Sequence, residues 1–500
     1  MTTFRGPIDR ATACFSDRPA LVDGLSGEVT TFADLGRHTR AVAVHLDRLG
    51  VPPGGRVAFL ADGSVPYAEW YLGVPAAGRI FVPLNTRYTE TELRAACNDC
   101  TPDILLTDRE QGLPGGLAPS VIAVTDIDLG MVPDRQAACV EVGENDPAAI
   151  FYTGGTTDRA KGVSLSHRNK LADALSFIIG FELQAEDRWL VMSPMFHAAG
   201  SFNVVPCTWV GAAQVFLPRF DAEMALRAIE THRTTATFAV PTMLAALCDA
   251  QERLGADTSS MRLLGHGGAP ITAALLDRVA RTFPGTEICG SYGATEMAPL
   301  ATIHRHQERV LGMDRSRSVG LPVVGVEVRA EDVSGHSAAP GELGELVVTG
   351  PNIMLGYWGK SEATAQVLRD ASYRSGDIGY CDAEGYVYVV DRSKDMIITG
   401  GENVYGVEVE DVLCSHPSVA EAGVIGRPDP RWGEVVVAVI VARTAVDAGE
   451  LDRHCRALLA GYKVPRTYVI REEPLPRSAA GKLLKRELRQ SMSAEPDARP

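Results

Sequence analysis

One short segment of the chain has the residue types of a phosphate-binding loop. Residues 152–163 have the sequence YTGGTTDRAKGV and follow an apolar run at 148–152. Glycines let backbone N–H groups converge on an anion, and threonine hydroxyls supply further donors. The segment is not a Walker A loop, because Lys161 is followed by glycine rather than by serine or threonine. A polyphosphate site is one interpretation of this segment, and a flexible Gly/Thr turn is the other.

Four further segments place glycine beside side chains that could contact a nucleotide. Their sequences are GGAP at 267–270, GSYGATE at 290–296, YRSGDIG at 373–379 and PRSAAGK at 476–482. The second of them combines an aromatic ring, a hydroxyl and a carboxylate, and the last ends in Lys482. His197 follows another apolar run, where a histidine is more often a core residue than a functional one. Each segment is a weak signal when it is taken alone.

Alternating strand and helix patterns predict the layers that position these segments. Strands are expected at 56–60, 79–83 and 103–106, and helices at 65–78 and 89–96. The same alternation returns between 186 and 293. A pattern of this kind predicts an α/β fold of doubly wound layers with largely parallel sheets.

The pattern changes near Ser318. Short alternating runs at 326–330, 344–350 and 385–391 predict a small antiparallel sheet or distorted β-barrel. The chain then continues with helices near 407–415 and 451–459 and strands near 422–425 and 435–442. We therefore expect a large N-terminal domain at 1–391, a linker at 392–394 and a small α+β domain at 395–500.

Length, charge and cysteine usage narrow the class of protein. Five hundred residues exceed one compact core, so two or more domains are expected. The net charge of -15 argues against a nucleic-acid partner. Neither a signal peptide nor a transmembrane helix is expected. Cys97 and Cys100 form a C-x-x-C without the second pair that a zinc site needs, which favours reduced cysteines in a cytoplasmic protein.

Taken together and in this order, the five segments resemble the motifs of the adenylate-forming superfamily. This superfamily contains acyl-CoA synthetases, firefly luciferases and peptide-synthetase adenylation domains, and the chain is most similar to fatty-acid–CoA ligases. A sixth matching segment, DRSKDMIITGGENV, lies at 391–404, and the resemblance runs from about Ala20 to Leu488. It implies that a carboxylate attacks the α-phosphate of MgATP to give acyl-AMP and pyrophosphate. A thiol, here coenzyme A, then attacks the acyl carbonyl after the small C-terminal domain has rotated.

The resemblance also implies roles for residues near the nucleotide. Phosphoryl transfer asks a protein mainly for positioning and for neutralisation of charge. Thr295 would reach the α-phosphate, and Mg²⁺ would be held by Glu296 and Thr156, since it prefers oxygen ligands. The β- and γ-phosphates would be held by Thr153, Thr156, Thr157 and Lys161, and the nucleoside would be contacted by Gly268, Ala269, Tyr292 and Gly293.

Further roles implied by the resemblance belong to the later part of the chain and to His197. Lys482 would stabilise the charge that develops in adenylation. Lys394 would be the hinge about which the small domain moves. The remaining assignments are the ribose for Asp377 and Arg392, the pantetheine channel for Gly400 and Gly401, and the junction of the acyl and thiol channels for His197.

Three positions depart from the family pattern. Gly154 replaces a serine of the phosphate loop, Asp158 replaces a glycine, and Gly406 replaces a proline. Asp158 would bring negative charge near the phosphates, so we expect it to weaken ATP binding rather than to change the type of reaction.

The segment after His197 bears on the choice of substrate. Residues 198–209 include neither lysine nor arginine. A dicarboxylic substrate would leave a buried carboxylate unpaired there, so an apolar monocarboxylic acid, fatty or aromatic, is expected. The alternatives are an acyl-AMP ligase that loads an acyl-carrier protein, and a non-catalytic binding protein. The sequence does not specify the oligomeric state.

Overall fold

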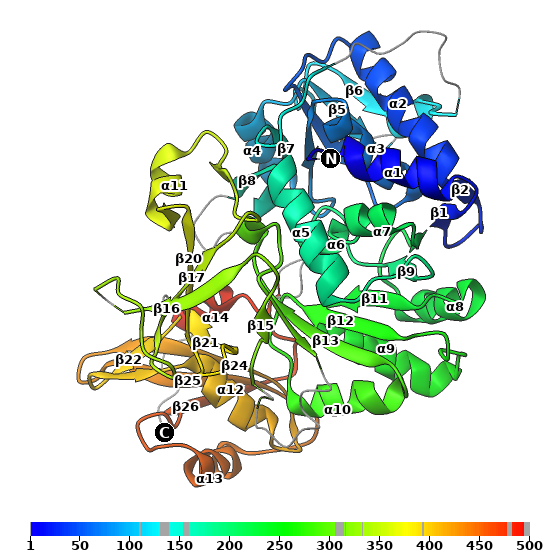
Figure 1. Ribbon diagram of the computed structural model, residues 1–500. Helices are drawn as coiled ribbons and strands as arrows, with labels where there is room; N and C mark the ends of the chain where they lie inside the picture. Colours follow the sequence, from blue (N-terminus) through cyan, green and yellow to red (C-terminus); the bar gives the residue numbers. More distant parts are fainter. Residues whose placement is uncertain are drawn as a thin grey trace. The chain divides into compact units, whose positions relative to one another are not determined.

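The computed structural model of the chain describes residues 2–109, 112–130, 140–153, 160–305, 315, 317–332, 334–392, 395–477 and 483–494. The chain divides into two compact units. The first unit comprises Met1–Gly268, Arg278–Val328 and Val348–Arg374, and the second comprises Ala269–Asp277, Arg329–Val347 and Ser375–Pro500. Figure 1 shows a mixed α/β fold, as the sequence predicts.

A seven-stranded sheet of the first unit carries the predicted phosphate loop. Its order is β18-β8-β7-β4-β3-β5-β6, and pairing is parallel from β7 to β6 and antiparallel at β8 and β18. The strands are β3 (Arg56–Leu60), β4 (Ile80–Pro83), β5 (Ile104–Thr107), β6 (Val121–Ala123), β7 (Pro147–Thr153), β8 (Lys161–Ser166) and β18 (Gly356–Tyr357). The strands predicted at 56–60, 79–83 and 103–106 are confirmed as β3, β4 and β5. Their largely apolar runs reflect burial of both faces of a parallel sheet.

A nine-stranded sheet of the first unit has the order β15-β14-β13-β12-β11-β9-β10-β1-β2. Its strands are β1 (Pro19–Asp23), β2 (Val29–Thr31), β9 (Arg188–Val191), β10 (Ala213–Phe216), β11 (Ala236–Ala239), β12 (Leu263–Gly267), β13 (Glu287–Tyr292), β14 (Thr302–Arg305) and β15 (Leu321–Pro322). The centre is parallel, and β2, β14 and β15 pair antiparallel at the edges. The α/β alternation predicted for 186–293 is therefore confirmed.

Helices of various lengths connect these strands. They are α1 (Arg5–Phe15), α2 (Phe32–Arg48), α3 (Val65–Ala76), α4 (Glu90–Cys100), α5 (His167–Gly180), α6 (Ala198–Ser201), α7 (Val204–Val210), α8 (Ala222–His232), α9 (Pro241–Leu254), α10 (Ala273–Thr282) and α11 (Ser361–Val367). The helices predicted at 65–78 and 89–96 are confirmed as α3 and α4. Among the described helices, none is long and apolar enough to cross a membrane.

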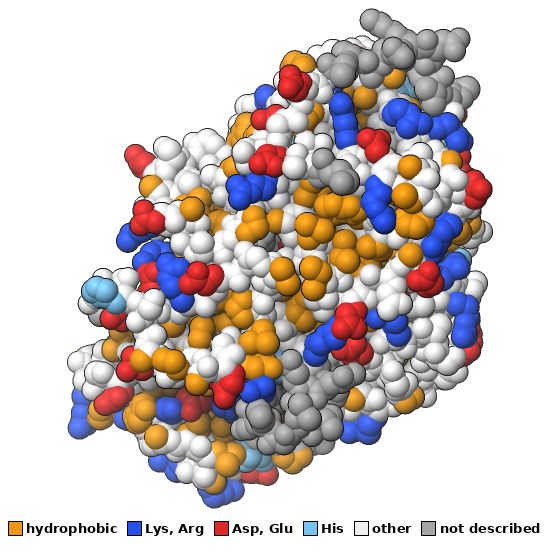
Figure 2. All heavy atoms as spheres, viewed as in Figure 1, with side chains coloured by type: hydrophobic (Ala, Val, Ile, Leu, Met, Phe, Trp, Pro, Cys, Tyr) orange, Lys and Arg blue, Asp and Glu red, His pale blue; other side chains and the backbone are white. Residues whose placement is uncertain are grey.

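Helix α5 packs against both sheets of the first unit. The Lys170 ammonium lies 5.8 Å from the ring centre of Phe151 in β7, and the ring of Phe177 lies 5.1 Å from that of Trp189 in β9. The opposite face of the helix is exposed, because Leu175 and Ile179, one turn apart, are 47% and 53% exposed. Figure 2 shows hydrophobic side chains gathered in the part of this face where Figure 1 draws α5. The helix thus separates a buried side that carries polar groups from an exposed apolar side.

A third sheet has the order β16-β17-β20-β19, and β21 also pairs with β20. Its strands are β16 (Glu327–Glu331), β17 (Gly344–Thr349), β19 (Leu368–Arg369), β20 (Ser372–Cys381) and β21 (Val387–Arg392). Both β19 and β21 run antiparallel to β20. The small sheet predicted after Ser318 is confirmed.

The rest of the second unit is an α+β layer. Its elements are β22 (Ile397–Thr399), β23 (Glu402–Val404), α12 (Gly406–Cys414), β24 (Val419–Asp429), β25 (Gly433–Ala442), α13 (Ala448–Leu458), β26 (Thr467–Arg471) and α14 (Lys485–Ala494). A core of Val409, Leu413, Val436, Ile440 and Leu451 joins α12 and α13 to β25. The elements agree with those predicted, whereas a domain boundary at 392–394 stays a prediction.

The nine cysteines within the described residues are free thiols. Burial raises the pKa of Cys97 to about 11 and, assisted by its neighbours, that of Cys100 to about 12. The C-x-x-C pair therefore lies in α4 as two protonated thiols at neutral pH.

Candidate active site

The two ends of the predicted phosphate loop are joined by the last pair of the antiparallel ladder between β7 and β8. Strand β7 ends at Thr153 and β8 begins at Lys161, and these two residues are paired across the ladder. Both side chains are partly buried. Thr156 and Thr157, as well as the unusual Gly154 and Asp158, lie outside the described residues. The ladder therefore positions Thr153 and Lys161 at the end of a buried strand, where the sequence predicts them.

A tyrosine that the motifs do not reveal links this ladder to Glu296. The Lys161 ammonium lies 4.8 Å from the ring centre of Tyr357, and the Tyr357 O–H donates to Glu296 Oε1 at 2.9 Å. Tyr357 and Glu296 are each 8% exposed. Burial and then the neighbouring Glu296 carboxylate raise the pKa of Tyr357. The contact depends on β18 pairing with β8, a long-range pairing that local sequence patterns do not predict.

The loop that carries Tyr292, Thr295 and Glu296 folds tightly back on itself. Tyr292 ends β13, and Thr295 begins a single 3₁₀ turn, Thr295–Met297. A Cβ atom on Gly293 would lie 1.8 Å from the Pro299 carbonyl oxygen. Glycine is therefore required at 293 by close backbone packing. Tyr292 at the end of β13 and Thr295 and Glu296 in the turn thus lie within five consecutive residues.

Three buried polar side chains form hydrogen bonds to the backbone of the same loop at residues 297–300. The Lys170 ammonium donates to the Ala298 carbonyl at 3.0 Å, and Asp173 Oδ1 accepts from the Leu300 N–H at 3.0 Å. Asn352 Nδ2 donates to the carbonyls of Met297 at 2.9 Å and Leu300 at 2.8 Å. The side chains of Lys170, Asp173 and Asn352, which we call the buttress, are each 1% exposed. Such buried donors and acceptors, when paired, fix backbone that forms no regular ladder.

The buttress includes a carboxyl group with an unusual titration. Burial raises the pKa of Asp173 to about 7, although the nearby Lys170 and the Leu300 N–H act in the opposite direction. The sequence alone does not indicate a role for Lys170 and Asp173, because charged residues on a helix are ordinarily solvent-exposed. Their spacing of three residues, which places both on one face of α5 beside Phe177, was the available signal.

Gly268 and Ala269 follow strand β12. Gly268 is exposed and has a φ of +78°. The preceding Gly267 would bring a Cβ within 2.7 Å of the Ser291 carbonyl oxygen, so β12 and β13 approach closely at this end. Ala269 belongs to the second unit. The turn is present as expected, and its contact with a nucleoside stays a prediction.

In the second unit, the two predicted ribose-binding residues are neighbours. Asp377 and Arg392 are paired between β20 and β21, and Arg392 Nε lies 3.2 Å from Asp377 Oδ1. Asp377 is buried at 7% exposure, and its N–H donates to Ser375 Oγ at 3.1 Å. The structure thus brings together a carboxylate and a guanidinium that the sequence places 15 positions apart.

Gly406, which departs from the family pattern, has a structural role. Its N–H donates to Asp391 Oδ2 at 2.6 Å at the start of α12. A proline has no N–H and could not make this bond. Lys394 and Lys482 lie outside the described residues. Arg477 and Leu483, which stand before and after Lys482 in the sequence, form an isolated β-bridge.

Gly400 and Gly401 form the two-residue turn between β22 and β23. Their φ angles are +61° and +87°, as a tight hairpin turn requires. The Gly400 N–H donates to the Trp432 carbonyl at 2.8 Å. The predicted pantetheine-contacting glycines thus lie at the exposed tip of a hairpin in the second unit.

His197 stands at the start of α6, and its ring lies 4.6 Å from that of Phe196. A small cavity lies close by in sequence, between the end of β9, α6 and β11. Its wall includes Trp189, Met192, Ser193, Phe202, Asn203 and Phe238, and none of its lining residues is charged. The segment after His197 therefore contributes to an uncharged interior, as its composition predicts.

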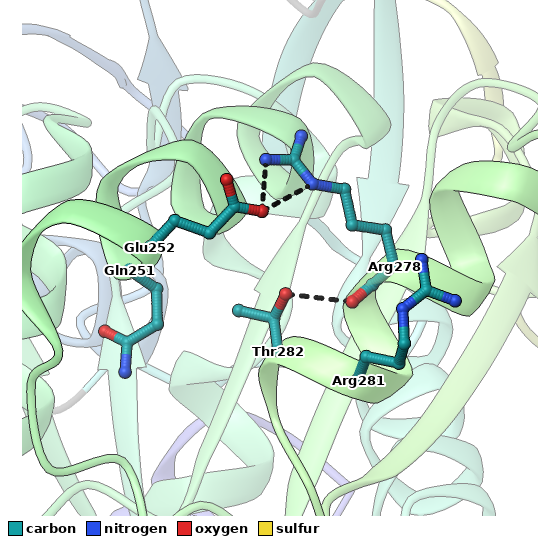
Figure 3. A pocket seen from close by; sticks show the side chains of 5 residues that line it. All are labelled: Gln251, Glu252, Arg278, Arg281 and Thr282. Carbon is teal, nitrogen blue, oxygen red and sulfur yellow. Dashed lines mark hydrogen bonds and ion pairs between the residues drawn. The ribbon is translucent and has the colours of Figure 1, made fainter. Parts of the chain in front are cut away.

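A second hollow lies between α9 and α10 and contains none of the predicted site residues. Figure 3 shows its lining residues, Gln251 and Glu252 of α9 and Arg278, Arg281 and Thr282 of α10, with Glu252 directed toward Arg278. Arg278 donates to Glu252 Oε1 at 2.7 Å and also pairs with Asp249. These pairs join two exposed helices, and we assign the hollow a structural role.

The chain belongs to the AMP-binding enzyme family. Residues 8–358 match the model described as AMP-binding enzyme, and residues 408–482 match the AMP-binding enzyme C-terminal domain. The resemblance to adenylate-forming enzymes that the motifs indicate is thereby confirmed.

Known proteins of this family are similar along nearly the whole chain. A feruloyl-CoA synthase of an Amycolatopsis species is 39% identical over 93% of this chain and 94% of its own length. An indoleacetate–CoA ligase of Aromatoleum aromaticum is 35% identical over 92% of each chain. The structure of o-succinylbenzoate CoA synthetase from Bacillus subtilis with its acyl-adenylate intermediate superposes with a TM-score of 0.86, at 32% identity, over 99% of this chain and 98% of the other. Another structure of that enzyme contains ATP and a magnesium ion.

Proposed function

We infer that this protein is an acid–thiol ligase that converts an aromatic monocarboxylic acid to its CoA thioester. In the first step an oxygen of the acid attacks the α-phosphorus of ATP, and the bond to the leaving pyrophosphate breaks. In the second step the sulfur of coenzyme A attacks the acyl carbonyl, loses its proton, and AMP leaves. The similarity to a feruloyl-CoA synthase along 93% of the chain carries this inference.

The described residues fit MgATP. Glu296 offers a carboxylate, the kind of hard oxygen ligand that Mg²⁺ prefers, on a loop with buried support. Lys161 supplies an ammonium at one end of the predicted phosphate loop, and Thr153 supplies a hydroxyl at the other end, opposite it in the ladder of β7 and β8. Bound Mg²⁺ would neutralise charge on the triphosphate during adenylation. The roles of Thr156, Thr157, Lys394 and Lys482 in this scheme rest on the family motifs.

Several observations favour an aromatic acid over a fatty acid or a dicarboxylic acid. Two of the three relatives described above act, by their names, on ferulate and indoleacetate, each of which has one carboxylate, and the third acts on o-succinylbenzoate, an aromatic acid with two. The relative with the highest identity of the three is the feruloyl-CoA synthase. The segment 198–209 after His197 has neither lysine nor arginine, and its Phe202 and Asn203 lie in an uncharged interior. A second carboxylate in such surroundings would lose its hydration without gaining a partner.

A panel of acids tests the proposal. Pyrophosphate release is measured with ferulate, indoleacetate, 2-succinylbenzoate and decanoate, each with and without coenzyme A. We expect kcat/KM for an aromatic monocarboxylate to exceed that for the other two acids at least about tenfold, which corresponds to about 1.4 kcal/mol. A preference for 2-succinylbenzoate would contradict our interpretation of the acyl pocket. Pyrophosphate release with no CoA thioester formed would support the carrier-protein alternative.

A further inference from the structure

The contacts of Tyr357 separate two charges that would otherwise attract each other. Its ring lies against the Lys161 ammonium at 4.8 Å, and its hydroxyl donates to Glu296 Oε1 at 2.9 Å. Among the described residues, Lys161 and Glu296 each contact Tyr357, and no ion pair joins the two directly. An ammonium and a carboxylate at a partly dry site attract each other strongly, so a spacer between them keeps both available.

The sheet explains why Tyr357 occupies this position. Tyr357 is paired with Val163 in the antiparallel ladder of β18 and β8. Lys161 lies two residues before Val163 on the same face, which makes it the diagonal neighbour of Tyr357. The Trp358 N–H donates to the Gly162 carbonyl at 2.7 Å and extends the pairing. The ring is therefore held by backbone pairing and does not depend on a bound nucleotide.

We propose that Tyr357 is a positioning residue that keeps Lys161 and Glu296 apart and oriented before nucleotide binds. The phenol O–H directs one carboxylate oxygen of Glu296, which leaves the other oxygen for the divalent cation of the nucleotide complex. The ring face holds the Lys161 ammonium beside the predicted phosphate loop through a cation–π contact. This inference rests on the proposed function, because it takes Glu296 as the metal ligand and Lys161 as a phosphate-binding cation.

Two substitutions separate the two contacts. Tyr357→Phe keeps the ring and removes the hydroxyl, whereas Tyr357→Leu removes both. Mn²⁺ serves as the probe, and its binding to the whole protein in the presence of ATP is measured by electron paramagnetic resonance. Binding of ATP without metal is measured by calorimetry.

For Tyr357→Phe we expect the Kd of Mn²⁺ to rise about tenfold, since a hydrogen bond to a charged group is lost. The Kd of metal-free ATP should change less than about twofold, because Lys161 keeps its contact with the ring. For Tyr357→Leu we expect both affinities to fall, that for ATP by about fivefold or more, because Lys161 is then free to pair with Glu296. A general loosening of the fold would not split metal binding from nucleotide binding in this way.

Tyr71→Phe is the matched control. Tyr71 is fully buried, its ring packs 5.5 Å from that of Phe81, and its hydroxyl has no hydrogen-bond partner among the described residues. This control should bind Mn²⁺ and ATP as the wild type does. Wild-type binding of Mn²⁺ by Tyr357→Phe would overturn the orienting role, and equal ATP affinity in Tyr357→Phe and Tyr357→Leu would overturn the spacer role. If Tyr357→Leu does not fold, Tyr357→Met, which also lacks the ring, takes its place in the comparison with Tyr357→Phe. Failure of the wild type itself to bind Mn²⁺ with ATP would instead overturn the proposed function.

Discussion

Gly293 in the first unit and Gly401 in the second both belong to segments marked by family motifs, yet their surroundings differ. A Cβ on Gly293 would lie 1.8 Å from the Pro299 carbonyl oxygen, whereas a Cβ on Gly401 would have no heavy atom of the other described residues within 4 Å, its chain neighbours aside. Gly401 instead has a φ of +87°, a conformation that side chains disfavour. Close packing therefore requires the first glycine, and backbone conformation requires the second.

The two segments also differ in how far buried side chains hold them in place. The loop after Gly293 is held by the buttress of Lys170, Asp173 and Asn352, all buried. The turn at Gly400 and Gly401 is exposed. A site for ATP benefits from groups that are fixed in advance, since binding then orders little. A hairpin tip whose predicted role is confined to the second step, contact with coenzyme A, does not need such buried support.

The largest effect should come from Gly293→Ala. The new methyl group would meet backbone atoms of Pro299, which cannot rotate away as a side chain would. We expect a loss of about 3 kcal/mol or more in the free energy of unfolding. Urea unfolding followed by circular dichroism measures this loss, and MgATP binding should weaken in parallel. A loss below about 1 kcal/mol would show that the loop can shift, and the contrast with Gly401 would disappear.

The second effect is a pH dependence from the buttress. In the folded protein the pKa of Asp173 is about 7, above its ordinary value of 3.8. Between these two pH values the folded chain keeps a proton on Asp173 that the unfolded chain releases. The contribution of Asp173 to stability therefore falls as pH rises from about 4 to about 7 and is constant above that. Asn does not titrate and can still accept from the Leu300 N–H.

The free energy of unfolding of Asp173→Asn, relative to that of the wild type, should consequently be about 2–3 kcal/mol more favourable to the variant at pH 8 than at pH 5. Unfolding midpoints of both proteins at the two pH values, at matched ionic strength, measure the gain. Asp17→Asn, at an exposed position, is the control and should show no such trend. A difference that stays constant with pH would contradict the protonated, buried state of Asp173.

The smallest effect should come from Gly401→Ala. Only the left-handed conformation is disfavoured there, so we expect a cost of about 1 kcal/mol, and less for Gly401→Asn because asparagine tolerates positive φ. Gly400→Ala should cost more than Gly401→Ala, since its Cβ would lie 2.9 Å from the Trp432 ring. Pyrophosphate release by Gly401→Ala should match the wild type while thioester formation slows. Equal slowing of both half-reactions would contradict the assignment of this turn to the second step.

Much of the fold could be predicted from local patterns, whereas the supports of the site could not. Largely apolar runs alternating with helix patterns predicted β3, β4 and β5, and the motif residues Asp377 and Arg392 do lie together. Tyr357 escaped notice because its contacts depend on the register of β18 against β8, and register between distant strands leaves no local trace. Asp173 escaped notice because burial of a carboxylate depends on what packs against the helix.

The protonated thiols of this protein have a consequence for an enzyme that handles activated acyl groups. Besides Cys97 and Cys100, the cysteines with raised pKa values in the described chain are Cys207, Cys248, Cys289, Cys381, Cys414 and Cys455. Only the thiolate form is a good nucleophile. An acyl-adenylate formed in the proposed first step would therefore meet few competing sulfur nucleophiles among these described cysteines, which would guard against self-acylation. Cys14, which is exposed, is the described cysteine that an alkylating label should find first.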